Sequence, residues 1–160
     1  MNTRAILVGG IAASLVIAMW EMIVEAILPD GAGLFGPPIA IGATLVRDLQ
    51  GSSNPIPFDG AALVIGLAAH MMNSVILAVV FGLAIGRRGL GSTGLLTAGI
   101  AWGAMVFAAM WFVVVPAVDP LVLNLNGTVF LVGHMMWGAA LGLLWGRFSG
   151  AEGSFSLRTA

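Results

Sequence analysis

The sequence predicts an all-α integral membrane protein, a four-transmembrane-helix bundle built from two similar tandem hairpins with a short surface helix in the first outer loop. Hydrophobic residues make up 59% of the 160 residues and charged residues only 8%, too few polar side chains to cover a water-soluble domain. Four stretches also approach the ~20 apolar residues that a helix needs to cross a bilayer. The chain, residues 1–160, is therefore expected to form a single transmembrane domain.

The apolar stretches define the predicted spans in chain order, which are residues 5–28, 61–85, 95–115 and 128–145. The first follows Arg4 and is too long for the apolar core of a signal peptide, so we interpret it as a retained span. Residues 29–60 form a long outer loop, and apolar residues at helical spacing predict the surface helix within residues 38–49. Residues 148–160 are predicted to be a flexible tail.

Charged residues divide the span ends into two sets. One set carries Arg4, Arg87, Arg88, Arg147 and Arg158, and the other carries Asp30, Asp48, Asp59 and Asp119, with Arg47 as its single cation. The positive-inside rule then places both termini in the cytoplasm of a cell with a bacterial-type inner membrane. The net charge of −1 and the absence of a long basic run argue against nucleic-acid binding, so we expect lipid, other membrane subunits or further copies of the chain as partners.

A segment that begins His-Met-Met occurs twice, at His70 and at His134, and these are the two histidines of the chain. Each histidine starts a ladder of small residues at every fourth position, which lies on one face of a helix. The ladders are Ser74, Ala78, Gly82 and Gly86 in the second span, and Gly138, Gly142 and Gly146 in the fourth. A weaker similarity between the first and third spans completes the predicted duplication of a two-helix hairpin.

The ladders predict where the histidines point. Small residues let helix backbones approach closely in lipid, so the ladder faces, and the histidines with them, should face the bundle interior. If the two ladders pack on each other at the cytoplasmic side, their helices must splay towards the outside. His70 and His134 would then stand across that opening.

Two carboxylates of the first span, Glu21 and Glu25, lie one turn apart in the outer half of the bundle. A charged side chain near the bilayer centre costs about 2.5 to 3.5 kcal/mol on insertion scales, so such residues usually face the interior and pair with one another. We therefore expect Glu21, Glu25, His70 and His134 to converge on one polar site.

The leading hypothesis is that this site binds a cofactor and that the protein serves electron transfer within a larger complex. Two imidazoles on opposing helices suit the axial positions of haem b. A mixed set of two glutamates and two histidines would instead suit a mononuclear Zn, Fe or Mn ion. Copper is less favoured, because methionines next to the histidines point about 100° away on a helix. Trp111 and Trp137 lie near enough along their spans to line a cofactor pocket.

Two other interpretations remain open. The polar residues would act only as packing contacts in a structural or assembly subunit, or they would form a proton or ion path or a quinone pocket, which Asn73 could extend. The sequence has no familiar catalytic motif, so enzymatic activity of the isolated chain is not predicted. The absence of cysteine excludes thiolate ligation.

Overall fold

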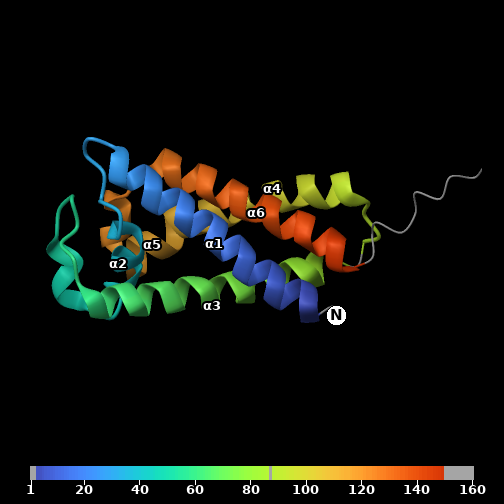
Figure 1. The fold of residues 1–160 in the computed structure, drawn as a ribbon, viewed down its shortest axis with the longest axis horizontal. Coiled ribbons are helices and arrows are strands. Elements are labelled where there is room, and N and C mark those ends of the chain that lie inside the picture. Colours follow the sequence, from blue (N-terminus) through green and yellow to red (C-terminus); the bar gives the residue numbers. More distant parts are fainter. Residues whose placement is uncertain (1–2, 87, 150–160) are drawn as a thin grey trace, which may run out of the picture.

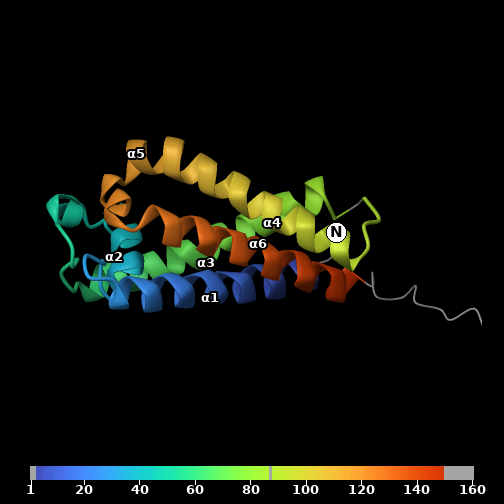
Figure 2. The same cartoon turned by 90° about the horizontal axis from the view of Figure 1, so that it is seen from above.

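Four long helices run along the length of the molecule in the computed structural model, which describes residues 3–86 and 88–149. They are α1 (Thr3–Ile27), α3 (Gly60–Ala84), a continuous helical segment that begins with α4 (Ser92–Ala109), and α6 (Gly127–Ser149). All four are long and apolar enough to cross a membrane. The prediction of an all-helical protein with four candidate transmembrane helices is confirmed, and no strand occurs within the described ranges (Figures 1 and 2).

Side-chain caps define where two of these helices begin. The carboxylate of Asp59 accepts a hydrogen bond of 2.7 Å from the backbone N–H of Ala62 at the start of α3. The side chain of Asn126 accepts from two backbone N–H groups at the start of α6. These caps satisfy N–H groups that the first turn leaves free, and both helices begin within one residue of the predicted spans.

The C-terminal end of α6 differs from the prediction. The last span was expected to end at residue 145 and the tail to begin at residue 148, but α6 continues to Ser149. Arg4 lies 5.2 Å from the ring centroid of Phe148, so this last turn has a cation–π partner from the start of α1. The remainder of the predicted tail, residues 150–160, lies outside the described residues, as do Arg87 and Arg158.

The third span continues beyond its predicted end at residue 115 and passes through Pro116. α4 is followed by a π-helical turn, η2 (Met110–Val114), and by α5 (Val115–Val118). In the π turn the backbone N–H of Val115 bonds to the carbonyl of Met110, five residues back. A proline has no N–H and its ring clashes with the preceding turn of a regular helix, so the wider π turn lets the helix continue.

The first outer loop is folded into the bundle. It contains a short helix, as predicted, but the helix is buried instead of lying on the surface over residues 38–49. The loop contains α2 (Gly36–Gly42) and a 3-10 turn, η1 (Arg47–Gly51). Nearly every residue of α2 is buried. The helix packs on α3, where a Cβ atom added at Gly42 would collide with the backbone of Ala62 and one at Gly66 with the backbone of Pro38. Two glycines therefore allow backbone contact that draws α2 inwards.

Helix α1 packs against both α3 and α6, and α6 packs against both α1 and α4. No comparably extensive contact joins α3 to α4 within the described chain. Figure 2 shows the α4–α5 segment on the opposite side of α6 from α1. The bundle is therefore open between α3 and the α4–α5 segment.

The two small-residue ladders do not pack on each other, so the ladder contact considered from the sequence does not form. On α6, Gly138 and Gly142 lie against the backbone of α4 at Gly99 and Leu95. On α3, the hydroxyl of Ser74 donates to a carbonyl of α1 over 2.6 Å. Close backbone approach therefore occurs between α6 and α4 and between α3 and α1.

The indole of Trp145 occupies the place where the ladders were expected to meet. This ring covers both Gly82 and Gly86 of α3, and its centroid lies 5.8 Å from that of Phe81. Because a bulky ring stands between α3 and α6, their backbones are held apart at this end of the bundle.

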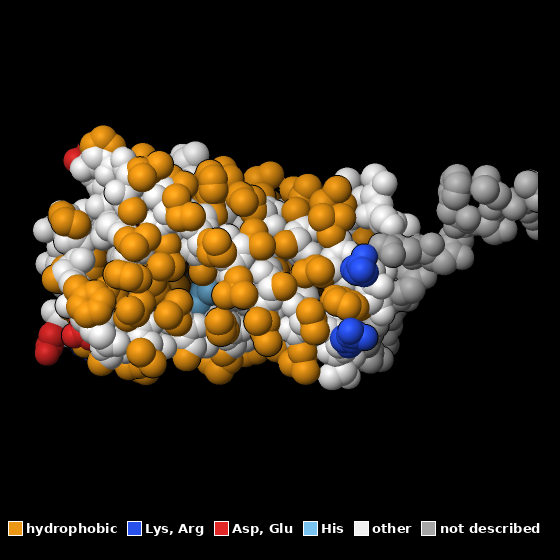
Figure 3. Space-filling model, in the orientation of Figure 1, with side chains coloured by type: hydrophobic (Ala, Val, Ile, Leu, Met, Phe, Trp, Pro, Cys, Tyr) orange, Lys and Arg blue, Asp and Glu red, His pale blue; other side chains and the backbone are white. Residues whose placement is uncertain are grey.

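The surface of the bundle is apolar along its length and charged at its ends. In the view of Figure 3, arginine side chains lie at the end that contains the N-terminus, and acidic side chains lie at the end that contains α2. Large apolar side chains are exposed on all four long helices. This distribution suits contact with lipid along the sides and with water at the two ends.

Candidate functional site

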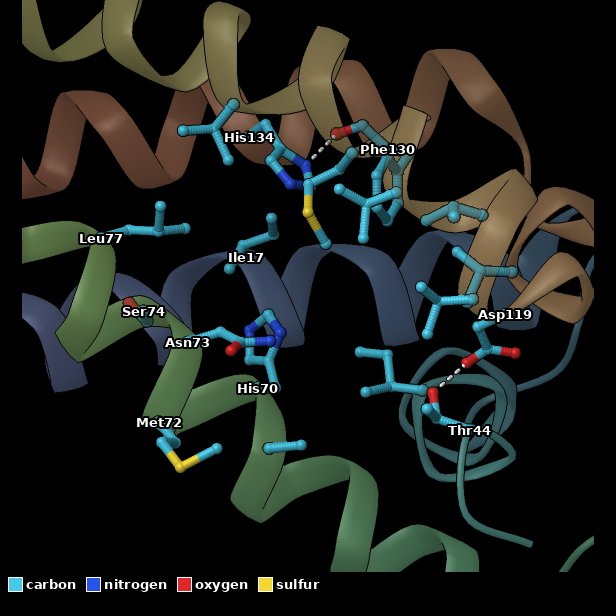
Figure 4. Close-up of a pocket in the computed structure, with 18 of the residues that line it drawn as sticks. Ile17, Thr44, His70, Met72, Asn73, Ser74, Leu77, Asp119, Phe130 and His134 are labelled. Carbon is cyan, nitrogen blue, oxygen red and sulfur yellow. Dashed lines mark hydrogen bonds between the residues drawn. The ribbon is translucent and has the colours of Figure 1, made fainter. Parts of the chain in front are cut away.

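A cavity of about 370 Å³ lies where α3 and the α4–α5 segment fail to meet. Helices α1 and α6 form its back, while α2 and η3 (Pro120–Asn124) contribute to its outer end. Most of its lining is aliphatic or aromatic, including Ile17 and Leu77 (Figure 4). The π turn supplies Met110 and Val114 to one wall, so the irregular stretch of the third span borders the cavity.

The cavity reaches the side of the bundle. Met72 on the α3 rim is 59% exposed, and Val114 and Val118 on the opposite rim are 39% and 46% exposed. Asn73, next to Met72, also lines the cavity and is exposed. In a membrane this flank would face lipid chains, so a molecule dissolved in the bilayer could enter without passing through water.

His134 projects from α6 into the cavity. Its Nδ1 lies 2.8 Å from the backbone carbonyl of Phe130, and the two rings have centroids 4.3 Å apart. Since a carbonyl can only accept, Nδ1 carries the hydrogen. In a neutral imidazole Nε2 is then a hydrogen-bond acceptor, and no described residue donates to it.

His70 stands on the opposite wall, on α3. Its Nε2 lies 3.2 Å from the backbone carbonyl of Ser14 on α1, so Nε2 carries the hydrogen and Nδ1 is the free acceptor of the neutral ring. Figure 4 shows the two imidazoles on α3 and α6 with the space of the cavity between them and Ile17 of α1 behind. The cavity therefore has an imidazole acceptor on each of two walls.

The two glutamates occupy different environments. Glu21 lines the cavity at 3% exposure, and its Oε1 is enclosed without a hydrogen-bond partner in the described chain. Glu25 does not line the cavity; its carboxylate accepts from the backbone N–H groups of Ala32 at 2.9 Å and of Asn126 at 2.7 Å. Glu25 thus joins the two outer loops, while Glu21 has an unpartnered oxygen.

The four predicted site residues are consequently not gathered in one ligand set. Three of them, Glu21, His70 and His134, line the cavity, whereas Glu25 lies at its outer side among loop backbone groups. Among the described residues no group of three or more His, Asp or Glu side chains is arranged to hold one metal ion.

The two tryptophans predicted to line the pocket also differ. Trp137 lines the cavity, and its indole N–H donates over 2.7 Å to the hydroxyl of Ser74, which in turn donates to the carbonyl of Gly10. This chain joins α6, α3 and α1 at one end of the cavity. Trp111 does not line it; its ring stacks on Phe107 at 5.9 Å and contacts Phe130 at 5.2 Å.

The outer end of the cavity contains a polar group that the sequence did not indicate. Asp119, 5% exposed, accepts hydrogen bonds from Thr44 at 2.7 Å and from Gln50 at 2.5 Å. Arg47 donates over 3.0 Å to the neighbouring carbonyl of Val118. The partners of Asp119 are 75 and 69 residues away in the chain, so the sequence could not pair them. The apolar run next to Asp119 was the one sequence feature consistent with its burial.

Chemically, the cavity combines an apolar lining with two imidazole acceptors, one unpartnered carboxyl group and the amide of Asn73. It contains no lysine or arginine among its lining residues. No protein-family model, curated protein or solved structure matches this chain. The cavity itself is therefore the basis for assigning a function.

Proposed function

We propose that this protein binds a lipophilic small molecule, which it takes up from the bilayer into the cavity between α3 and the α4–α5 segment. The observation that carries the proposal is the pair of histidines on opposing walls, each with a ring nitrogen that has no hydrogen-bond partner among the described residues. Ligand sites are typically apolar concavities in which a few converging polar groups set the orientation of the ligand.

The energetics favour occupation of this cavity. A buried polar group without a partner costs about 1 to 3 kcal/mol, and Oε1 of Glu21 is such a group in this lining. A ligand that donates hydrogen bonds would relieve this cost while its apolar part replaces lipid against the walls. The volume of about 370 Å³ lies in the range of small-ligand pockets, roughly 300 to 1,000 Å³.

A pair of adjacent alanines offers a matched test. Ala69 lines the cavity, while Ala68 is exposed and does not. The indole of Ala69→Trp should fill the cavity and abolish saturable ligand binding. Binding of tritiated naphthalene derivatives to the protein in nanodiscs would be measured by scintillation proximity, with empty nanodiscs as the blank. Ala68→Trp should bind as the wild type does. Absence of saturable binding of every naphthalene probe to the wild type, or equal binding by both variants, would contradict the proposal.

A second candidate is a bis-imidazole haem site with a role in electron transfer. One ring N–H of each histidine donates to a backbone carbonyl, and the other ring nitrogen is free. This arrangement favours the haem site, because such outer hydrogen bonds orient metal-ligating imidazoles. The detergent-purified protein would then show a Soret band that disappears in His70→Ala and in His134→Ala. A spectrum without that band excludes this candidate and leaves the first proposal intact.

We further propose that the protein lies in a bacterial-type inner membrane with its arginine-bearing end in the cytoplasm, and that its two hairpins arose by duplication. The separation of basic and acidic ends supports this orientation (Figure 3), and the contacts of α1 with α3 and of α4 with α6 support the hairpin pairing. The chain has no cysteine, so Ser52→Cys and Ser92→Cys can each be labelled alone. In intact spheroplasts, an impermeant maleimide should label Ser52→Cys and spare Ser92→Cys, and the reverse would overturn the orientation.

A further inference from the structure

We infer that the ligand is a lipophilic amine in its cationic form, with its ammonium group paired with the carboxylate of Glu21 in a cavity whose two imidazoles offer further hydrogen-bond acceptors. This inference rests on the proposed function, since it names the chemical class that the same cavity would take. The polar lining decides the charge of the ligand and the direction of its hydrogen bonds.

The charge of the lining is acidic. Two carboxyl groups, Glu21 and Asp119, line the cavity without a lysine or arginine beside them in that lining. Asp119 is already paired, since Thr44 and Gln50 each donate to one of its oxygens. Glu21 receives no hydrogen bond from any described residue, and its Oε1 is enclosed. An ionised carboxylate in an apolar site needs a cationic or donor partner, so Glu21 is the lining group that a cationic ligand would pair with.

The position of Glu21 brings its carboxyl group close to both histidine-bearing walls. A Cβ atom added at Gly133, the residue before His134, would lie 3.2 Å from Oε1 of Glu21. On α1, Ser14, Ile17 and Glu21 follow at the three- and four-residue spacing of one helix face, and His70 bonds to the carbonyl of Ser14. The carboxyl group of Glu21 therefore lies in the same cavity as both imidazoles.

The hydrogen-bond directions point to the same class of ligand. Both free imidazole nitrogens accept, as does an ionised carboxylate, whereas an ammonium group has three donors and no acceptor. A quinone offers only acceptors, so it has no donor for the imidazoles. A hydroxyl group can donate, but its oxygen also accepts, and the amide of Asn73 is the one unpaired donor in the lining. The rings of Phe130 and Trp137 also line the cavity and could add cation–π attraction.

Three probes with one naphthalene body separate these contributions in nanodisc-reconstituted wild-type protein at neutral pH. They are 1-naphthylmethylamine, 1-naphthylmethanol and the trimethylammonium analogue of the amine. We expect the amine to bind at least about tenfold more tightly than the alcohol, because charge-assisted hydrogen bonds are roughly twice as strong as neutral ones. The trimethylammonium compound keeps the charge but cannot donate, and should bind at least about threefold more weakly than the amine.

Glu21→Gln provides the matched variant, because it keeps the size of the side chain and removes its charge. The amine-to-alcohol preference should fall to within about twofold in this variant, and saturable binding of the alcohol, at whatever affinity, shows that the cavity is intact. Equal binding of amine and alcohol to the wild type, equal binding of the amine and its trimethyl analogue, or an unchanged preference in Glu21→Gln would overturn the inference. If no naphthalene probe binds at all, the proposed function itself fails.

Discussion

Gly138→Ala should weaken the bundle because this glycine lies at the contact between α6 and α4. The new Cβ would lie 2.9 Å from the carbonyl carbon of Gly99 and closer still to its oxygen, whereas ordinary contacts begin at 3.4 Å. Relief of the contact with this oxygen would require the helices to separate by more than an ångström at this point. Overpacking of this kind costs about 1 to 3 kcal/mol, which exceeds the roughly 0.5 to 1 kcal/mol that alanine gains over glycine in a helix.

Gly146→Ala is the matched control on the same helix. Its Cβ would meet only the end of the Leu95 side chain, at 3.4 Å, so the helix gain should remain and stability should be unchanged or higher. The two detergent-solubilised variants would be unfolded by adding SDS, and the loss of helix would be measured by circular dichroism. If Gly138→Ala unfolds at the same SDS fraction as Gly146→Ala, the close contact of α6 with α4 is refuted.

Three further predictions concern the polar contacts. Glu25→Ala leaves the buried N–H of Ala32 and the part-buried N–H of Asn126 unpaired. It should reduce the free energy of unfolding by about 1 to 3 kcal/mol, with partial recovery in Glu25→Gln; wild-type stability of Glu25→Ala in the SDS titration would contradict this. Asp119→Ala releases Thr44 and Gln50 and should accelerate proteolysis of the first outer loop, so an unchanged cleavage rate would show that Asp119 does not hold the loop. Trp137→Phe removes one hydrogen bond and should cost about 1 kcal/mol; a loss beyond about 3 kcal/mol would assign Trp137 mainly to packing.

The four candidate membrane-spanning helices could be predicted because hydropathy and length are visible in the sequence itself. What the sequence could not show was which helices are neighbours. The glycine ladder of α6 required a close partner, but the partner is Gly99 on α4 and not the ladder of α3. Small residues indicate close approach without identifying the opposing backbone.

The outer loop shows the same limit. Residues 38–49 had helical spacing, yet the helix is α2, and it is buried because Gly42 and Gly66 permit contact with α3. The continuation of the third span past Pro116 depends on the π turn, whose i to i+5 hydrogen bond has no sequence signature of its own.

The candidate site could be predicted only as far as helix faces allow. The histidine faces follow from residue spacing, and both histidines line the cavity. Glu21 and Glu25 lie one turn apart and could not be separated by spacing. They differ because the N–H groups that bind Glu25, those of Ala32 and Asn126, come from loops whose folded positions depend on long-range packing.

The tautomers of the two imidazoles test the account most directly, because they determine which nitrogen faces the cavity. The chain has two histidines, so ¹⁵N-histidine NMR in nanodiscs would show two rings, assigned with a His70→Gln variant. We predict that His134 carries its hydrogen on Nδ1 and His70 on Nε2, and that His134 Nε2 and His70 Nδ1 shift when 1-naphthylmethylamine saturates the protein. The same tautomer in both rings, or resonances that do not move with saturating amine, would contradict the account.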